Sequence, residues 1–385
     1  MPDRLSVLMI APQFYPLVGG YERAAERLAV ELVSNGHSVT VVAERRNREW
    51  PRKQVLRGVR IRRIWCAFKP GWHTFTSFVS FLVFLMLNGR RFDVLHVHQY
   101  GHHLALAVAL RRLLGKPVVL KLTSTATQGI SQALVGKSSS SSLFVRLHQK
   151  VNALIATSAA AVEEAAHFGI PKERIYLISN GIDTERYAPC SLQDRAMLKE
   201  RLGYRRPFTV LYTARLAPAK NPTGLLEAWS LIHREVSDCD LVLVGDGPLR
   251  QKLADQIDRL GLFDSVQLAG YQEDVLPWYQ AADVFVLPSH HEGLSNSLLE
   301  ALSCGLPVVS TRVSGSTDVF EAADVGELVE VGDIPGFAKA LRSLLENPDR
   351  RKICGTKARQ YAVQKCSIRA VANATANLYQ TVCRT

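Results

Sequence analysis

The fold of this chain is decided by the stretch His290-His291-Glu292-Gly293-Leu294-Ser295-Asn296-Ser297-Leu298-Leu299-Glu300-Ala301-Leu302-Ser303-Cys304-Gly305-Leu306-Pro307-Val308-Val309. The apolar run 283–288 in front of it predicts a buried strand. Ser295 or Asn296 suits the start of a helix, and Gly305 followed by Pro307 suits its end. The pattern therefore predicts a strand, a polar turn, a helix and a second strand.

Two carboxylates, Glu292 and Glu300, bracket the start of this helix. They are eight residues apart, which corresponds to about 12 Å at helical rise. Between them lie the amides of a helix N-terminus, which stabilise a phosphate. Acids on a helix are usually only solvated, but here the strand, glycine and proline are in register with them. A nucleotide sugar has hydroxyls at both ends and phosphates in the middle, and it suits this pattern. The donor-binding candidates are Gly293, Leu294, Ser295, Asn296, Ser297 and Glu300.

Glu-x7-Glu followed by Ala-x-x-x-Gly-x-Pro-Val-Val resembles the signature of the retaining glycosyltransferases of family 4 (glycosyl transferases group 1), which have the GT-B fold. The resemblance implies an α/β protein with two facing Rossmann-like, doubly wound domains and a cleft between them. It implies that Glu300 binds the ribose and Glu292 the sugar hydroxyls. A nucleotide-diphosphate sugar would be the co-substrate, with no bound cofactor and no metal.

A second motif follows the apolar run 208–213. Arg215 and Lys220 are five residues apart across a turn, so both can converge on a diphosphate, arginine as a fork and lysine as a point charge. Two bases in a loop are often merely solvated. Here their place after a strand and their similarity to the family's Gly-Arg-Leu…Lys pattern favour binding, although Ala214 replaces the frequent glycine. We expect Arg215, Lys220 and Glu292 to carry catalysis.

Other donor-binding candidates follow other predicted strands. Gly19 and Gly20 open the first strand-helix-strand unit, where glycine lets the backbone approach a ligand. The dehydrogenase pattern Gly-x-Gly-x-x-Gly is absent there, and the sequence is similar to the first loop of the family 4 enzymes. Gly247 matches the family's Gly-x-Gly-Pro, and Tyr271 follows a strand whose end borders the nucleotide base in relatives.

The acceptor side is less defined. Many relatives carry a histidine near the end of the strand 117–123, where this chain has Leu122, so the resemblance leaves a catalytic histidine in doubt. His98, Lys121 and Thr123 are candidate acceptor or cleft residues, although a single histidine or lysine at a strand end is more often hydrogen-bonded or solvated.

Chain length and pattern predict two domains. Residues 1–183 form the N-terminal, acceptor-side Rossmann-like domain, which the C-terminal helix 368–385 completes. Residues 184–206 form a linker, and residues 207–367 form the nucleotide-sugar-binding domain.

The net charge of +12 is concentrated in the first half: residues 1–190 carry 25 Lys and Arg against 12 Asp and Glu, whereas the rest is close to neutral. A basic field attracts an anionic membrane or an acidic acceptor. No nucleic-acid-binding motif accompanies it, so we expect no nucleic acid partner. The apolar stretch 72–87 is shorter than the roughly 20 residues of a membrane span. It predicts either a core helix or a helix that inserts partly into a bilayer surface.

Seven scattered cysteines without Cys-x-x-Cys indicate neither a disulfide framework nor a zinc site. With no signal peptide at the start, we expect a cytoplasmic protein, attached peripherally to the inner face of the cell membrane.

These observations predict a retaining, metal-independent glycosyltransferase of the hexosyltransferase type, in polysaccharide or glycolipid biosynthesis. The acceptor would be a glycan, a lipid-linked sugar or a small molecule. The alternatives are a GT-B sugar-nucleotide epimerase, which acts on the donor without an acceptor, a phosphorylase, which releases sugar phosphate from a glycan, and a non-catalytic sugar-binding partner.

Overall fold

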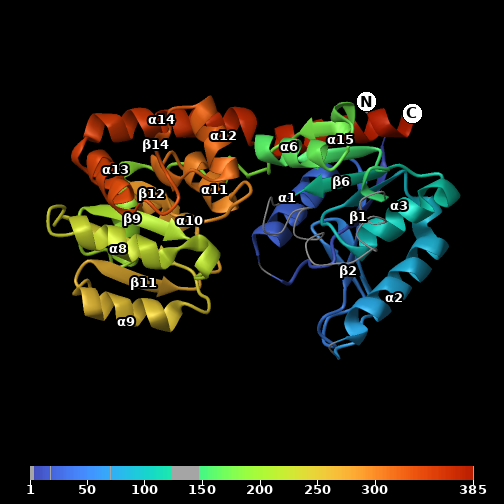
Figure 1. Ribbon diagram of the computed structural model, residues 1–385, viewed down its shortest axis with the longest axis horizontal. Coiled ribbons are helices and arrows are strands. Elements are labelled where there is room, and N and C mark those ends of the chain that lie inside the picture. Colours follow the sequence, from blue (N-terminus) through green and yellow to red (C-terminus); the bar gives the residue numbers. More distant parts are fainter. Residues whose placement is uncertain (1–3, 18, 70, 123–146, 385) are drawn as a thin grey trace. The chain divides into compact units, whose positions relative to one another are not determined.

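The structure is a computed structural model of the chain that describes residues 4–17, 19–69, 71–122 and 147–384 (Figure 1). It divides into two compact units. The N-terminal unit consists of Met1–Gly181 together with Ile368–Thr385, and the C-terminal unit of Ile182–Ser367. Residues 184–206 belong to the C-terminal unit and contain the helix α7 (Leu192–Arg201).

The N-terminal unit is built on an eight-stranded sheet with the strand order β3-β4-β2-β1-β5-β6-β7-β8. All its strands pair in parallel except β3 and β4, which pair antiparallel. Parallel strands are buried on both faces, which explains their continuous apolar runs. The strands are β1 (Ser6–Ile10), β2 (Ser38–Glu44), β3 (Lys53–Leu56), β4 (Val59–Ile64), β5 (Val94–Val97), β6 (Val118–Leu122), β7 (Ala153–Ala156) and β8 (Ile175–Leu177).

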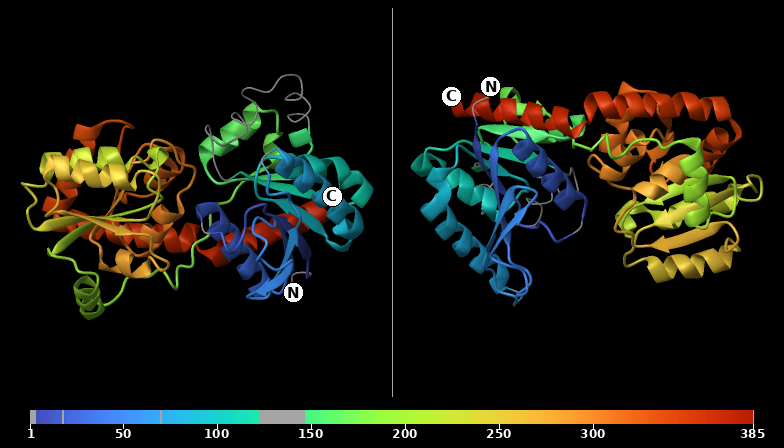
Figure 2. Two further views of the ribbon diagram at one scale, coloured as in Figure 1. Left: turned by 90° about the horizontal axis from the view of Figure 1, so that it is seen from below. Right: turned by 180° about the vertical axis from the view of Figure 1, so that it is seen from behind.

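Two hydrophobic cores lie on the two faces of this sheet. One contains side chains of α1 and α15, the other side chains of α2, α3 and α6. The last helix, α15, lies along α1, where Asn35 Nδ2 donates to Asn373 Oδ1 at 3.0 Å (Figure 2). The helices are α1 (Gly20–Ser34), α2 (Trp72–Asn88), η1 (Gly89–Arg91), α3 (His102–Leu114), α6 (Ala159–His167), η2 (Lys172–Arg174) and α15 (Ile368–Arg384).

The C-terminal unit has a six-stranded parallel sheet in the order β11-β10-β9-β12-β13-β14. In such a sheet the loops after neighbouring strands meet at one edge, which is where ligands bind in doubly wound domains. The strands are β9 (Phe208–Thr213), β10 (Cys239–Val244), β11 (Val266–Gly270), β12 (Val284–Leu287), β13 (Val308–Thr311) and β14 (Gly326–Val329). The other helices are η3 (Pro218–Lys220), α8 (Pro222–Ile232), α9 (Arg250–Leu260), α10 (Leu276–Ala281), α11 (Asn296–Ser303), α12 (Ser314–Ala322), α13 (Ile334–Glu346) and α14 (Pro348–Lys365).

Helix α2 differs from the expected core helix. Its buried residues are Thr76, Ser77, Phe81 and Leu85 only, and large apolar side chains cover its outer face. Together with η1 it forms a continuous helix of 20 residues, Trp72–Arg91, so it is longer than the sequence suggested. By length and composition it could cross a membrane, but core helices of soluble proteins meet the same criterion. What distinguishes α2 from a core helix is its exposed apolar face.

Candidate active site

The two motifs predicted to hold the donor meet in the C-terminal unit. The loop after β9 ends in η3, where the carbonyl oxygen of Ala219 accepts the backbone N–H of His290 at 2.9 Å. This contact places Lys220 beside the turn after β12, and its Nζ forms an ion pair with Oε2 of Glu292. Both side chains are only partly buried, so a ligand can reach them. The charge of Glu292 is therefore already balanced without a ligand.

Glu300 is positioned by the hydroxyl group of Tyr279, which in turn contacts that of Thr213. It lies on α11 and is buried, and Oε2 accepts a hydrogen bond from Tyr279 Oη at 3.1 Å. Tyr279 Oη also contacts Thr213 Oγ1 at the end of β9. Burial, followed by the nearby charge of Glu300, raises the pKa of Tyr279 well above its ordinary value. The hydroxyl therefore stays protonated and acts as a donor to the carboxylate.

The start of α11 has the features of an anion site. Ser295 is the N-cap residue with extended backbone angles, but its side chain accepts no hydrogen bond from the helix. Its Oγ lies 2.9 Å from Oγ of Ser297 instead. A helix N-terminus whose N-cap side chain does not bind its backbone amides favours an anion through these amides and the helix dipole. The helix ends as predicted, with Gly305 in the left-handed region directly after it.

The turn before α11 is held by a glycine that sequence reasoning did not single out. Gly315 on α12 donates its N–H to the carbonyl oxygen of Gly293 at 3.0 Å. A Cβ at position 315 would lie 2.3 Å from that oxygen and 2.6 Å from Cα of Leu294. Only glycine fits there, so α12 fixes the backbone that precedes the helix start.

Arg215, Gly247 and Tyr271 follow β9, β10 and β11 respectively. Arg215 is exposed, and among the described residues its guanidinium has no recorded ion pair. A Cβ at Gly247 would lie 2.5 Å from the carbonyl oxygen of Leu216, so this glycine has a packing reason independent of any donor contact. Tyr271 is largely exposed. Their contacts with a donor stay predictions.

The predicted residues of the N-terminal unit lie at the carboxyl edge of its own sheet. Gly19 caps α1 in an extended conformation and Gly20 begins the helix. His98 directly follows β5 and Lys121 lies in β6, and both are buried. Thr123 lies outside the described residues. The four candidates that the structure describes therefore lie at or near the carboxyl edge of this sheet, the edge at which ligands bind in doubly wound domains.

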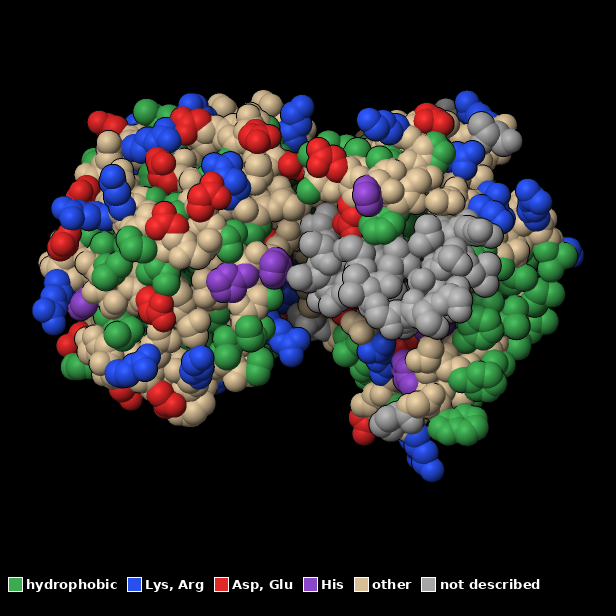
Figure 3. Space-filling view, viewed as in Figure 1, with side chains coloured by type: hydrophobic (Ala, Val, Ile, Leu, Met, Phe, Trp, Pro, Cys, Tyr) green, Lys and Arg blue, Asp and Glu red, His purple; other side chains and the backbone are tan. Residues whose placement is uncertain are grey.

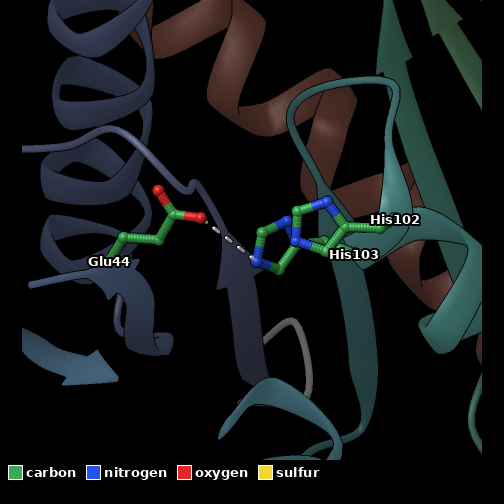
Figure 4. Close-up of side chains that lie close together, drawn as sticks. All are labelled: Glu44, His102 and His103. Atoms are coloured by element: carbon green, nitrogen blue, oxygen red, sulfur yellow. Dashed lines mark ion pairs between the residues drawn. The ribbon is translucent and has the colours of Figure 1, made fainter. Parts of the chain in front are cut away.

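A further cluster of titratable side chains, which the sequence did not suggest, surrounds Glu44 at the end of β2 (Figure 4). His102 and His103 offer ring nitrogens near the carboxylate, a spacing that suits a metal ion. Ser77 Oγ lies at the centre, 2.7 Å from Glu44 Oε1, 3.2 Å from Nε2 of His103 and 3.4 Å from Nε2 of His102. The Arg46 guanidinium binds Glu44 Oε2 at 2.7 and 2.9 Å.

A hydroxyl group donates one hydrogen bond and accepts two, which matches the three neighbours of Ser77. The charge of Glu44 is balanced by Arg46. The cluster is therefore satisfied as a hydrogen-bond network, and a cation would have to compete with Arg46 for the carboxylate.

The sequence also contains one Asp-x-Asp pair, Asp238-Cys239-Asp240, a pattern that can bind metals. It lies at the amino end of β10, opposite the edge where the donor motifs meet. Asp240 accepts the backbone N–H of Arg205 at 3.1 Å and forms an ion pair with Arg206 at 3.3 Å. The carboxylate of Asp240 is therefore engaged by backbone and side chain at the start of the sheet.

Solved structures that also contain two Rossmann-like parallel sheets of this kind are GT-B glycosyltransferases. Anabaena HepE in complex with UDP and glucose matches with a TM-score of 0.80 at 19% identity, over 98% of this chain and 100% of that one. Sucrose-phosphate synthase from Thermosynechococcus elongatus matches with a TM-score of 0.81 at 20% identity, over 98% and 99% of the two chains. The fold is therefore GT-B.

Sequence comparison gives the family. The model described as Glycosyltransferase Family 4 matches residues 18–186, and the model described as Glycosyl transferases group 1 matches residues 195–361. N-acetyl-alpha-D-glucosaminyl L-malate synthase of Bacillus anthracis is 25% identical over 98% of both chains. A GDP-mannose-dependent phosphatidylinositol monomannoside mannosyltransferase of Mycolicibacterium smegmatis is 32% identical over about half of each chain. The chain belongs to the group 1, family 4 glycosyltransferases with the GT-B fold.

Proposed function

We propose that this glycosyltransferase transfers a hexose from a nucleotide-diphosphate sugar to an acceptor hydroxyl with retention of anomeric configuration. The observation that carries the proposal is the arrangement around α11. One glutamate, paired with Lys220, precedes the helix start, where the side chain of Ser295 does not cap the helix, and a second, oriented by Tyr279, lies within the helix. A sugar, a diphosphate and a ribose need these three environments in this order.

In the proposed reaction the bond between C1 of the sugar and the diphosphate oxygen breaks, and the acceptor oxygen bonds to C1 on the same face. The acceptor proton passes to the departing phosphate oxygen. Arg215, Lys220 and the α11 amides stabilise the negative charge that develops on the diphosphate. Glu300 accepts a hydrogen bond from the ribose, and Glu292 binds sugar hydroxyls. No step in this path needs a metal ion or a carboxylate nucleophile.

The nature of the donor and acceptor is supported by the names of similar proteins. HepE is bound to UDP and glucose, and relatives use GDP-mannose or UDP-Gal according to their names. The named acceptors of these relatives include L-malate, a phosphatidylinositol mannoside and a diphosphoundecaprenol-linked sugar. For this chain we propose a glycan, a lipid-linked sugar or a small molecule as acceptor, in polysaccharide or glycolipid synthesis.

An acceptor in a membrane would fit the outer face of α2. The space-filling view shows hydrophobic side chains gathered along this helix (Figure 3). The exposed apolar residues on and beside it are Trp65, Phe68, Trp72, Phe75, Val79, Val83, Met86 and Leu87. Arg90 and Arg91 directly follow it in η1. An apolar face next to basic residues is suited to an anionic bilayer surface, so we propose peripheral membrane attachment of a cytoplasmic enzyme.

The proposal is tested by thermal unfolding with a panel of nucleotide sugars, followed by transfer assays with the stabilising donor. Specific binding to the native state raises the midpoint of unfolding. A transferase consumes this donor only when an acceptor is present, and it keeps its activity in a metal chelator. Conversion of the donor without an acceptor would indicate the epimerase, and phosphate-dependent release of sugar phosphate the phosphorylase. Binding without any turnover would indicate a non-catalytic protein.

A further inference from the structure

A buried lysine without an acidic partner lies in the sheet of the N-terminal unit. Lys121 belongs to β6, which is flanked by β5 and β7, and only 2% of the residue is exposed. Among the described residues no hydrogen bond or ion pair of its Nζ is recorded. Burial lowers the pKa of Lys121 to about 8, and no carboxylate opposes this shift. Residues 123–146, which directly follow β6, contain no aspartate or glutamate.

Two histidines lie beside this lysine. His96 belongs to β5, next to β6, and His98 directly follows β5; their ring centroids are 4.2 Å apart. Among the described residues, Nε2 of each ring is buried and has no hydrogen-bond partner. Tyr21, at the start of α1, lies edge-on to His98 with ring centroids 6.3 Å apart, and its hydroxyl is buried and unpartnered too.

The side chains of His98 and Tyr21 can act as hydrogen-bond donors, and Lys121 carries a positive charge. Burial, followed by the charges of His96 and Lys121, lowers the pKa of His98 well below its ordinary value, so the imidazole is neutral and can donate from one nitrogen. Buried lysines are almost always paired, because leaving the charge unpaired costs several kcal/mol, on the order of 3–5. An unpaired buried lysine at the carboxyl edge of such a sheet, where ligands bind in doubly wound domains, therefore indicates an anionic ligand.

We propose that Lys121, His98 and Tyr21 form a receptor for one anionic group, a carboxylate or a phosphate, of the acceptor substrate. The anion forms the ion pair with Lys121, which has no acidic partner among the described residues, and His98 and Tyr21 donate hydrogen bonds to it. The acceptor class is thereby narrowed to acidic molecules. The assignment of this anion to the acceptor rests on the proposed function, but the anion site itself does not.

The test uses thermal unfolding of the full-length protein with inorganic phosphate and with succinate, against chloride at equal ionic strength. If the dissociation constant is about one tenth of the anion concentration, specific binding raises the midpoint by about 3 °C. Phosphate stabilises most proteins by exclusion from their surface, so the informative quantity is the difference between variants. The variant is Lys121→Met, and the control is Lys150→Met, an exposed lysine of the same unit.

We expect Lys121→Met to unfold at a higher temperature than the wild type without anions, because it removes an unpaired buried charge, and to lose the specific response to phosphate or succinate. Lys150→Met should respond like the wild type. A response in Lys121→Met equal to that of the wild type overturns the site, and so does the absence of any specific response in the wild type. If Lys121→Met does not fold, Lys121→Gln serves for the same comparison.

Two further arms identify the source of the anion. Phosphate against succinate distinguishes a phosphate from a carboxylate as the preferred group. With saturating UDP present, the response to phosphate should persist, because the nucleotide belongs to the C-terminal unit. Its disappearance assigns the anion to the donor and overturns the acceptor assignment. Stabilisation by UDP itself should be intact in Lys121→Met. A wild type that binds no nucleotide of a panel counts against the proposed function and leaves the anion response to be judged separately.

Discussion

Tyr279 Oη donates a 3.1 Å hydrogen bond to Oε2 of Glu300, and both side chains are buried. This hydrogen bond restricts the orientation of the Glu300 carboxylate. In the proposed complex the carboxylate accepts a hydrogen bond from the ribose hydroxyl. We therefore propose Tyr279 as a positioning residue that acts through Glu300.

Tyr279→Phe removes this donor while keeping the ring that packs in the core. We expect the dissociation constant of the nucleoside diphosphate to rise by about 3- to 10-fold, since a hydrogen bond of this kind contributes roughly 0.5–1.5 kcal/mol. Calorimetry with the wild type and the variant measures it. The matched control is Tyr204→Phe, a partly buried tyrosine of the same unit whose buried hydroxyl has no hydrogen-bond partner among the described residues. Equal affinities of the Tyr279 variant and the wild type would contradict the positioning role.

The pairing of Lys220 with Glu292 bears on catalysis. We expect Arg215→Ala and Lys220→Ala to lower kcat more than donor binding, because the positive charges meet a diphosphate charge that grows in the transition state. One preorganised donor contributes about 2.7–4 kcal/mol in such sites, a loss of roughly 100- to 1000-fold in kcat. Lys252→Ala on α9 provides an exposed control. Variants with near-wild-type kcat on a verified donor would remove both residues from the catalytic assignment.

Much of this site was predictable from sequence because its signals are local. Glu292, Glu300 and the caps of α11 lie within twenty residues, and Arg215 and Lys220 follow a single strand. Tyr279 was missed, since its partner is 21 residues away and a buried tyrosine before a strand looks like any core residue. Gly315 was missed for a similar reason, because its role depends on contact with a backbone that is distant in sequence.

In the N-terminal unit, His98 and Lys121 were candidate residues from the sequence, but the contact between His98 and Tyr21 was not predicted. Sequence reasoning missed the cluster around Glu44 altogether, since its members come from β2, α2 and α3 and share no spacing. For helix α2 the sequence left a core helix and partial insertion into a bilayer surface as alternatives. Composition cannot reveal which face of such a helix is covered, since that depends on β4 and α3 packing against one side only.

The exposed face of α2 predicts binding to anionic membranes. Wild-type protein should float with vesicles containing anionic lipid at low salt and be released as the salt concentration rises. The double variant Phe75→Ser/Leu87→Ser should bind much more weakly, because each side chain is more than half exposed and would contribute about 1.5–3 kcal/mol on full burial.

The matched control for flotation is Leu192→Ser/Met197→Ser, which removes two exposed apolar side chains from α7 in the other unit. It should float like the wild type. Equal binding to neutral and anionic vesicles, or equal loss in both double variants, would contradict attachment through α2.

The lowered pKa of Lys121 predicts that the free energy of unfolding depends on pH. Its pKa is lowered from 10.5 to about 8 by burial, so the unfolded chain binds more protons than the folded protein between these values. The free energy of unfolding contributed by this group therefore rises with pH across the window from about 8 to 10.5, by roughly 3 kcal/mol at most. His96 does not titrate there, because burial, followed by the charge of Lys121, lowers its pKa to about 3.

Urea unfolding at the two ends of this window measures the effect as the difference between wild type and Lys121→Met. At the lower pH, Lys121→Met should have a higher free energy of unfolding than the wild type, and this difference should become smaller at the higher pH. A difference that is constant with pH would mean that Lys121 is not held as an unpaired charge.

Retaining transfer from a nucleotide sugar is tested most directly by NMR of the transfer product. With an α-linked donor identified by the binding panel, we expect an α-linked product from the wild type. Glu292→Gln should form little product while still binding the donor, and intact-mass spectrometry should find no sugar attached to the protein. A β-linked product, or a sugar covalently bound to Glu292, would contradict the account.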